Sequence, residues 1–221
     1  RDAPKWIERS PLPFRFRVHE AGDFVNFQRR GLTCKIFRMP TYIALLRGIN
    51  VSGQKLIIMA DLQAHFESFG ATQVRTYIQS GNVVFAHRTK TSAPLRRDLE
   101  KHLAAKLGYA VPTLVKSSKE FATIAEANPY DTTLPKLGKR VYVCFFEKAP
   151  ASDAIKSILS LTTGDERLTV IGDAGYACYF NGLGRAKLNS NIIERKLGMT
   201  TLRNWNTVNA LLELAQPKSL A

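Results

Sequence analysis

The sequence predicts an α+β fold made of two ferredoxin-like (split β-α-β) subdomains in one compact body, and three observations predict it. Short apolar runs typical of strands alternate with amphipathic stretches of helical spacing. In residues 41–116 these elements follow the order β-α-β-β-α-β, which is the order of a split β-α-β unit. The same order recurs after residue 140, without a residue-level repeat.

The first predicted subdomain spans residues 39–128. Its helices are marked by apolar residues three or four positions apart, as in Leu95, Leu99 and Leu103. Ser117 and Glu120 form the pattern of a capping box, which starts a third, short helix. In order, we expect a strand at 41–47, a helix at 59–69, strands at 74–79 and 82–87, a helix at 92–107, a strand at 111–116 and the short helix that stops before Pro129.

The second predicted subdomain spans residues 140–221 and includes a C-terminal helix. A linker at 129–139, which contains Pro129, Pro135 and Gly138, separates it from the first. In order, we expect a strand at 140–147, a helix at 150–161, strands at 168–171 and 176–180 around a turn, a helix at 189–197, a short strand at 200–202 and a final helix at 203–214.

Residues 1–38 differ from the rest of the chain. They mix Pro, Arg and Phe without a sustained period of 2 or 3.6, and they begin with Arg1. Met39 then leads directly into a strand pattern. We expect residues 1–38 to be a non-native or disordered N-terminal extension. The alternative is a basic aromatic arm that binds nucleic acid.

Composition narrows the classes of partner. The 221 residues contain 32 Lys and Arg against 18 Asp and Glu, a net charge of +14 that favours anionic partners. No apolar run approaches the roughly 18 residues of a membrane span.

The three cysteines form no C-x-x-C pair, so we expect no zinc site and no disulfide framework. Reduced thiols predict a cytoplasmic protein, with Cys144 and Cys178 in the core.

Four segments stand out from generic scaffold. They are Leu45–Lys55, Arg75–Phe85, Asn181–Leu188 and Arg203–Val208. Together they resemble the bacterial domain of unknown function 1697 family, whose members share the strings LLRGINVGG, TYIQSGNVVF, NGxGRSKL and RNWNTV. The resemblance covers about residues 39–216, with Ser52 where Gly is usual and Ala186 where Ser is common. It implies two ferredoxin-like subdomains and implies no particular chemistry.

The first of these segments nearly matches a phosphate-binding loop, G-x-x-x-x-G-K-[ST]. It departs from that pattern because Gln54 replaces the Lys and Lys55 replaces the Ser or Thr. A weaker interpretation is an anion nest of backbone amides, helped by Arg47, Asn50, Ser52 and Lys55. Alternatively, the glycines only permit unusual backbone angles, and Arg47 and Asn50 brace the loop.

The other segments carry similar alternatives. The first and third strands are neighbours in a ferredoxin-like sheet, so we expect Arg47, Asn50, Gln79 and Asn82 to meet at one edge, as a ligand site or as a hydrogen-bonded bracket. The loop with Gly182, Gly184, Arg185 and Lys187 precedes a helix start and is an anion-site candidate or a structural loop. In the fourth segment, Asn204 or Asn206 is a candidate helix N-cap.

We therefore predict that a basic cleft between the subdomains binds a phosphate- or carboxylate-bearing small ligand, such as a nucleotide. The candidate ligand-binding residues are Arg47, Asn50, Ser52, Lys55, Gln79, Asn82, Gly182, Gly184, Arg185, Lys187, Arg203, Asn204 and Asn206. The segments contain no His, Cys, Asp or Glu, which favours binding over catalysis and indicates no metal site. The sequence identifies no cofactor and no oligomeric state.

Two alternatives belong to other classes. The first is nucleic-acid binding, in which bases would stack on an open sheet face that carries Tyr142, Phe146, Tyr176 and Phe180. We prefer to place these aromatic residues in a core packed on helices. The second is a structural or interaction protein, in which the polar loops join two halves of the chain or two protomers. Burial of their cations against carbonyls and carboxylates would favour this second alternative.

Overall fold

The computed structural model describes residues 15–18, 24–29, 32–37, 39–51, 53, 55–132, 139–162 and 166–216. The chain divides into two units, residues 1–40 and residues 41–221. In the first unit, strands β1 (Arg15–Val18), β2 (Phe24–Arg29) and β3 (Leu32–Phe37) form an antiparallel sheet in the order β1-β2-β3. The expectation that residues 1–38 form a non-native or disordered extension stays a prediction.

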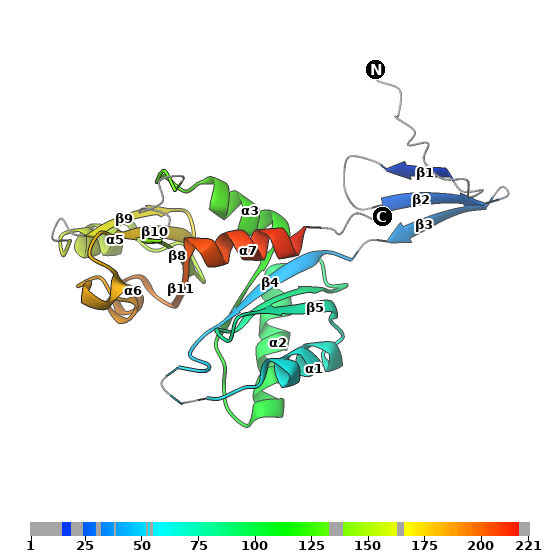
Figure 1. The fold of residues 1–221 in the computed structure, drawn as a ribbon, viewed down its shortest axis with the longest axis horizontal. Helices are drawn as coiled ribbons and strands as arrows, with labels where there is room; N and C mark the ends of the chain where they lie inside the picture. Colours follow the sequence, from blue (N-terminus) through cyan, green and yellow to red (C-terminus); the bar gives the residue numbers. More distant parts are fainter. Residues whose placement is uncertain are drawn as a thin grey trace, which may run out of the picture. The chain divides into compact units, whose positions relative to one another are not determined.

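The second unit contains two four-stranded antiparallel sheets (Figure 1), which confirms the predicted α+β class. We call residues 41–132 the first half and residues 139–216 the second half. The first half contains β4 (Thr41–Leu46), α1 (Met59–Ser68), β5 (Thr72–Tyr77), β6 (Asn82–Ala86), α2 (Ser92–Leu107), β7 (Thr113–Ser117) and α3 (Ser118–Glu126). Its strand order is β5-β6-β4-β7, so the first and third strands are neighbours as predicted.

The second half repeats this topology with the strand order β11-β8-β10-β9. Its elements are β8 (Val141–Phe146), α5 (Ser152–Leu159), β9 (Glu166–Ile171), β10 (Ala174–Tyr179), a 3-10 turn η1 (Leu183–Arg185), α6 (Ser190–Leu197), β11 (Thr200–Asn204) and α7 (Trp205–Ala215). Helix α7 begins two residues later than predicted, because residues 203 and 204 belong to β11 and pair with β8.

Strand alternation distributes the apolar residues of each sheet between two cores. In β4, Tyr42, Ala44 and Leu46 pack beneath α1 and α2, while Ile43 and Leu45 point to the opposite face. That opposite face belongs to a central core that both halves share. The central core consists of Ile43, Leu45, Val84 and Leu114 from the first sheet, Phe121, Ile124 and Ala125 from α3, Val143, Phe145, Ala174 and Tyr176 from the second sheet, and Val208, Leu211 and Ala215 from α7.

The aromatic residues of the second sheet are divided between cores in the same way. Tyr142 and Phe146 pack with the core beneath α5 and α6, whereas Tyr176 lies in the central core. Strand register explains the division, because Tyr176 pairs with Val143 and so shares its face. Phe146 and Tyr176 are completely buried. The preferred core placement is confirmed for these two residues, and they do not form an open surface for base stacking.

Candidate functional site

The predicted meeting of loops at one sheet edge is present. Leu45 pairs with Asn82 across β4 and β6, and the Leu46 amide donates to the Gly81 carbonyl at 2.8 Å. Beyond the strand ends, the Asn50 side-chain amide donates to the Gln79 carbonyl at 3.0 Å. The loop after β4 and the turn before β6 are therefore held together, as the strand order requires.

Asn50 braces its own loop. Its side chain donates to the Ile57 carbonyl at 3.1 Å and accepts from the Ile57 amide at 2.8 Å. Gly48 and Gly53 have φ angles of 69° and 74°, in the region that favours glycine. Three residues, 56–58, separate this loop from α1, so its amides do not lead into a helix as in a phosphate-binding loop. Ser52 lies outside the described residues.

Arg203 is buried, with 9% of its surface exposed, and it joins the two halves. It donates to two oxygens within β11 and to three oxygens of the first half. The acceptors are Thr201 Oγ1 at 2.6 Å and the Leu202 carbonyl at 2.9 Å, then Asn82 Oδ1 at 2.5 Å, the Leu46 carbonyl at 2.8 Å and the Ser80 carbonyl at 3.2 Å. Burial lowers the pKa of its guanidinium to about 10. With these five bonds made, the side chain holds the two halves together.

Two further predicted cations are engaged inside the protein. The Arg47 guanidinium makes a two-pronged ion pair with the carboxylate of Glu194 in α6. The Lys55 ammonium donates to the Ala110 carbonyl at 3.2 Å and lies 5.4 Å from the centre of the Tyr109 ring. Arg47 thus forms a second link between the halves, and Lys55 fastens its loop to the segment before β7.

The 182–188 loop does bind an anion, and the anion is the protein's own Glu166. This carboxylate, 5% exposed at the start of β9, accepts the backbone amides of Lys187 at 2.5 Å and Leu188 at 2.7 Å. Sequence reasoning missed Glu166, because only tertiary pairing brings it to a loop about twenty residues away. The Lys187 side chain is exposed, as are Gly182 and Gly184, and the side chain of Arg185 lies outside the described residues.

The last predicted segment starts α7. The Asn204 side chain accepts the Asn206 amide at 3.0 Å and is the N-cap, and its own amide donates to the Lys139 carbonyl at 3.2 Å. The side chain of Asn206 is exposed, as is that of Gln79. Trp205 packs against the central core. Most of the predicted polar residues that the structure describes therefore serve as a bracket between and within the halves.

A basic hollow lies elsewhere, where the first half meets the end of β8. It has a volume of about 750 Å³ and is lined by the start of α2, by β7 and by residues 146–148. We call it the α2 groove. Its cations are Lys90, Arg96, Arg97, Lys116 and Lys148, and its carboxylates are Glu120 and Glu147. Cations from three separate segments thus converge on one hollow.

The first turn of α2 adds hydrogen-bond donors to the positive potential of the groove. Its N-cap residue, Thr91, gives no side-chain bond to that turn, and both Thr91 and Ser92 line the groove.

The carboxylate of Glu120 is held by hydrogen bonds. Ser117 and Glu120 cap α3 with a reciprocal pair of bonds. Glu120 also accepts the Ser92 hydroxyl at 2.6 Å. Burial raises the pKa of Glu120, but hydrogen bonds from Ser92 and Ser117 outweigh it and leave the pKa below its ordinary value.

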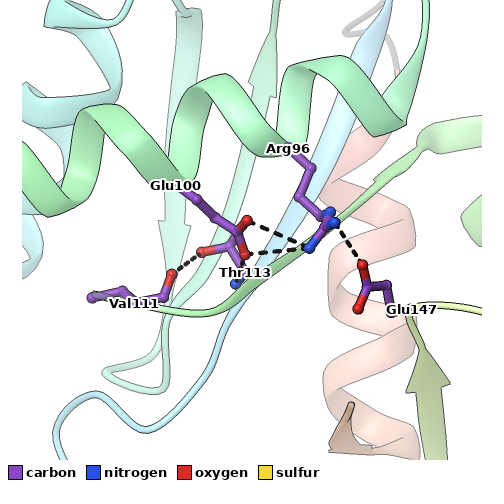
Figure 2. Close-up of polar contacts among 5 residues, drawn as sticks. All are labelled: Arg96, Glu100, Val111, Thr113 and Glu147. Atoms are coloured by element: carbon purple, nitrogen blue, oxygen red, sulfur yellow. Dashed lines mark hydrogen bonds and ion pairs between the residues drawn. The ribbon is translucent and has the colours of Figure 1, made fainter. Parts of the chain in front are cut away.

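Ion pairs hold two of the groove's cations. Figure 2 shows Arg96 between two carboxylates, with Glu147 at 2.6 Å and Glu100 at 3.4 Å. Lys116 pairs with Asp173, in the turn between β9 and β10. Arg97 and Lys148 are exposed and form no ion pair with any residue that the structure describes. These two side chains are therefore available to an anion from solution.

The groove offers little for acid–base or metal chemistry. None of its lining residues is a histidine or cysteine. Among the described residues, no group of three or more His, Cys, Asp and Glu side chains could hold a metal ion. Cys144 and Cys178 are buried free thiols, and burial raises the pKa of Cys144 to about 12. No helix in the described part of the chain has the length and apolar character to span a membrane.

Comparison with known proteins agrees with the fold. The chain is similar to a solved structure of a conserved bacterial protein from Streptococcus pneumoniae, with a TM-score of 0.63 and 23% sequence identity, over 80% of this chain and 99% of that one. No curated protein matches the chain. The family model described as "Protein of unknown function (DUF1697)" matches residues 39–176, which is more than half of the chain. The chain therefore belongs to the DUF1697 family.

Proposed function

We propose that the α2 groove binds a small ligand through a phosphate or carboxylate group. The observation that supports this is the convergence of five cations from three segments on one hollow of about 750 Å³, with Arg97 and Lys148 exposed and without ion pairs. The groove lies between the halves, as the predicted cleft does, but its residues are different. Leu114 and Val115 add apolar lining for the remainder of a ligand.

The proposed activity is binding rather than catalysis. Glu120 is committed to the cap of α3 and Glu147 to Arg96, so neither carboxylate is available as a general base. The loops at 47–55, 79–82 and 203–206 maintain the relative position of the halves. Because the groove is lined by both halves, this bracket also keeps the two walls of the site in place.

The test is isothermal titration calorimetry of the full chain with inorganic phosphate, nucleotides, sugar phosphates and short oligonucleotides. We expect Arg97→Ala and Lys148→Ala each to weaken binding by about tenfold or more, because each removes a charged hydrogen bond worth roughly 1.5–3 kcal/mol. Lys106→Ala is the matched control, since Lys106 is an exposed cation of α2 outside the groove.

Lys187→Ala tests the other location, because Lys187 is the exposed cation of the 182–188 loop. Binding that is lost in Lys187→Ala and retained in Arg97→Ala would move the site to that loop. Binding that no variant changes would contradict the α2 groove. A response to oligonucleotides alone, steeply weakened by salt, would favour nucleic acid as the partner.

A further inference from the structure

One carboxylate of the α2 groove, that of Glu147, is already paired with a cation of the groove. Glu147 follows β8 and holds the Arg96 guanidinium at 2.6 Å, and both side chains line the groove. Figure 2 shows Arg96 extending from α2 towards Glu147, across the junction between the halves. The side chains are 20% and 34% exposed, so the pair is accessible from the hollow.

Glu100 holds Arg96 much more loosely. Its oxygens lie 3.4 and 3.5 Å from the guanidinium, and one of them accepts the Thr113 amide at 2.8 Å. Glu100 is not part of the groove lining, and its bond to Thr113 fixes it to the start of β7. Glu147 is therefore the close partner of Arg96, and it is the partner that stands inside the groove.

We infer, on the basis of the proposed function, that Glu147 makes the groove selective for phosphate monoesters over carboxylates. A ligand carboxylate offers Arg96 the same bonds that Glu147 already makes. Because Glu147 is tethered, it competes at an effective concentration of order millimolar or higher. A free monocarboxylate of similar intrinsic strength gains little by replacing it.

A phosphate monoester interacts with the groove differently from a carboxylate. It carries roughly −1.5 to −2 charges at neutral pH and three acceptor oxygens. It can displace Glu147 from Arg96, or contact Arg97 and Lys148 while the pair stays intact, because those two cations are unpaired among the described residues. Glu147 repels the dianion more strongly than it repels a monocarboxylate. The second charge and the third oxygen of the monoester strengthen its bonds to Arg97 and Lys148, however, so the monoester depends less than a carboxylate does on gaining Arg96. Specificity comes from a repulsive element as well as from attractive ones.

The test compares phenyl phosphate with benzoate, two probes that share an aromatic ring and differ in the anion. Calorimetry at pH 7.5 would measure both for the wild-type chain, Glu147→Gln and Asp98→Asn. Asp98 is an exposed carboxylate of α2 outside the groove, so its variant makes the same charge change away from the site. Thermal unfolding followed by circular dichroism would verify that each variant is folded.

We expect the wild-type chain to prefer phenyl phosphate, Glu147→Gln to bind benzoate about tenfold more tightly (a change of about 1.4 kcal/mol), and Asp98→Asn to keep the wild-type preference. A preference that is the same in wild type and Glu147→Gln would overturn the role of Glu147. If Arg97→Ala still weakened binding in that case, the proposed function would stand. If neither probe bound wild type or Glu147→Gln, both the site and this inference would fail.

Discussion

Arg203 belongs to a polar sequence motif, yet its side chain is buried, and its hydrogen bonds clamp the two halves together. Its guanidinium has a pKa of about 10 and is therefore charged at neutral pH. Among the described residues, no carboxylate lies within ion-pairing distance of it, so five neutral oxygens provide all of its stabilisation. The planar guanidinium group of Arg, with its five N–H donors, can donate to acceptors in two sheets at once, which no other side chain can do.

Replacing Arg203 by Lys should therefore destabilise the protein although the charge is kept. Lys presents three donors at one point, which leaves buried acceptors such as Asn82 Oδ1 unpaired. We expect a loss of about 3 kcal/mol in the free energy of unfolding, measured by urea denaturation. Arg195→Lys, at an exposed position of α6, is the control and should change stability by less than about 0.5 kcal/mol. Equal effects of the two substitutions would rule out the clamp.

At the scale of elements, the contact between α1 and β6 contains a titratable group. The ring of Phe69, just after α1, stacks on His87 at 5.1 Å and lies 5.4 Å from His102. His87 Nδ1 accepts the Thr89 amide at 3.1 Å, which requires a neutral ring with its proton on Nε2. Burial lowers the pKa of His87, Arg88 lowers it further, and Asp98 opposes the change.

This lowered pKa makes stability depend on pH. The unfolded chain, in which His87 has an ordinary pKa near 6.5, binds a proton more readily than the folded chain does. The stabilisation is therefore complete above about pH 6.5 and is lost as the pH falls through the lower folded value. We expect His87→Asn, which keeps an acceptor for Thr89, to flatten the fall in urea midpoint between about pH 7 and pH 5. An unchanged slope in that variant, or an equal flattening in His65→Asn, would contradict this assignment.

At the scale of the whole 41–221 unit, the two halves are united by the central core. Helix α7 follows the second sheet in sequence, yet it packs against β4 and β6 of the first half as well as β8. The Tyr176 hydroxyl donates to the Ile124 carbonyl of α3 at 2.6 Å, and the Phe121 and Phe145 rings stack at 5.1 Å across the same boundary. Neither half buries its sheet completely without the other.

We therefore expect the 41–221 unit to unfold in one transition. Leu211→Ala, at a completely buried site of α7, should lower stability by about 2–5 kcal/mol. Urea unfolding of a Trp6→Phe background, followed by circular dichroism and by Trp205 fluorescence, should shift equally in both signals. Leu159→Ala, at a partly exposed position of α5, is the matched control. Separate midpoints for the two signals would mean that the halves unfold independently.

Local structure was largely predictable from the sequence. Helix α2 spans residues 92–107 as expected, and Ser117 and Glu120 form the predicted capping box. Residue spacing and cap chemistry act over a few positions, so they are readable along the chain. The strand expected at 74–79 lies at 72–77, and it ends before Ile78, whose φ of 47° is outside the extended region. Nothing in the local sequence predicts that angle.

The sequence by itself determined the order of the elements, the pairing of first and third strands, and the arrival of polar loops at one edge. Only the tertiary structure decided what those loops do, since the partners of a cation or amide are set by contacts between distant segments. Arg203 meets Leu46 across 157 positions, Arg47 meets Glu194 across 147, and Glu166 fills the loop predicted to hold an anion. For the same reason, the α2 groove joins side chains from α2, β7 and the end of β8 that no local pattern connects.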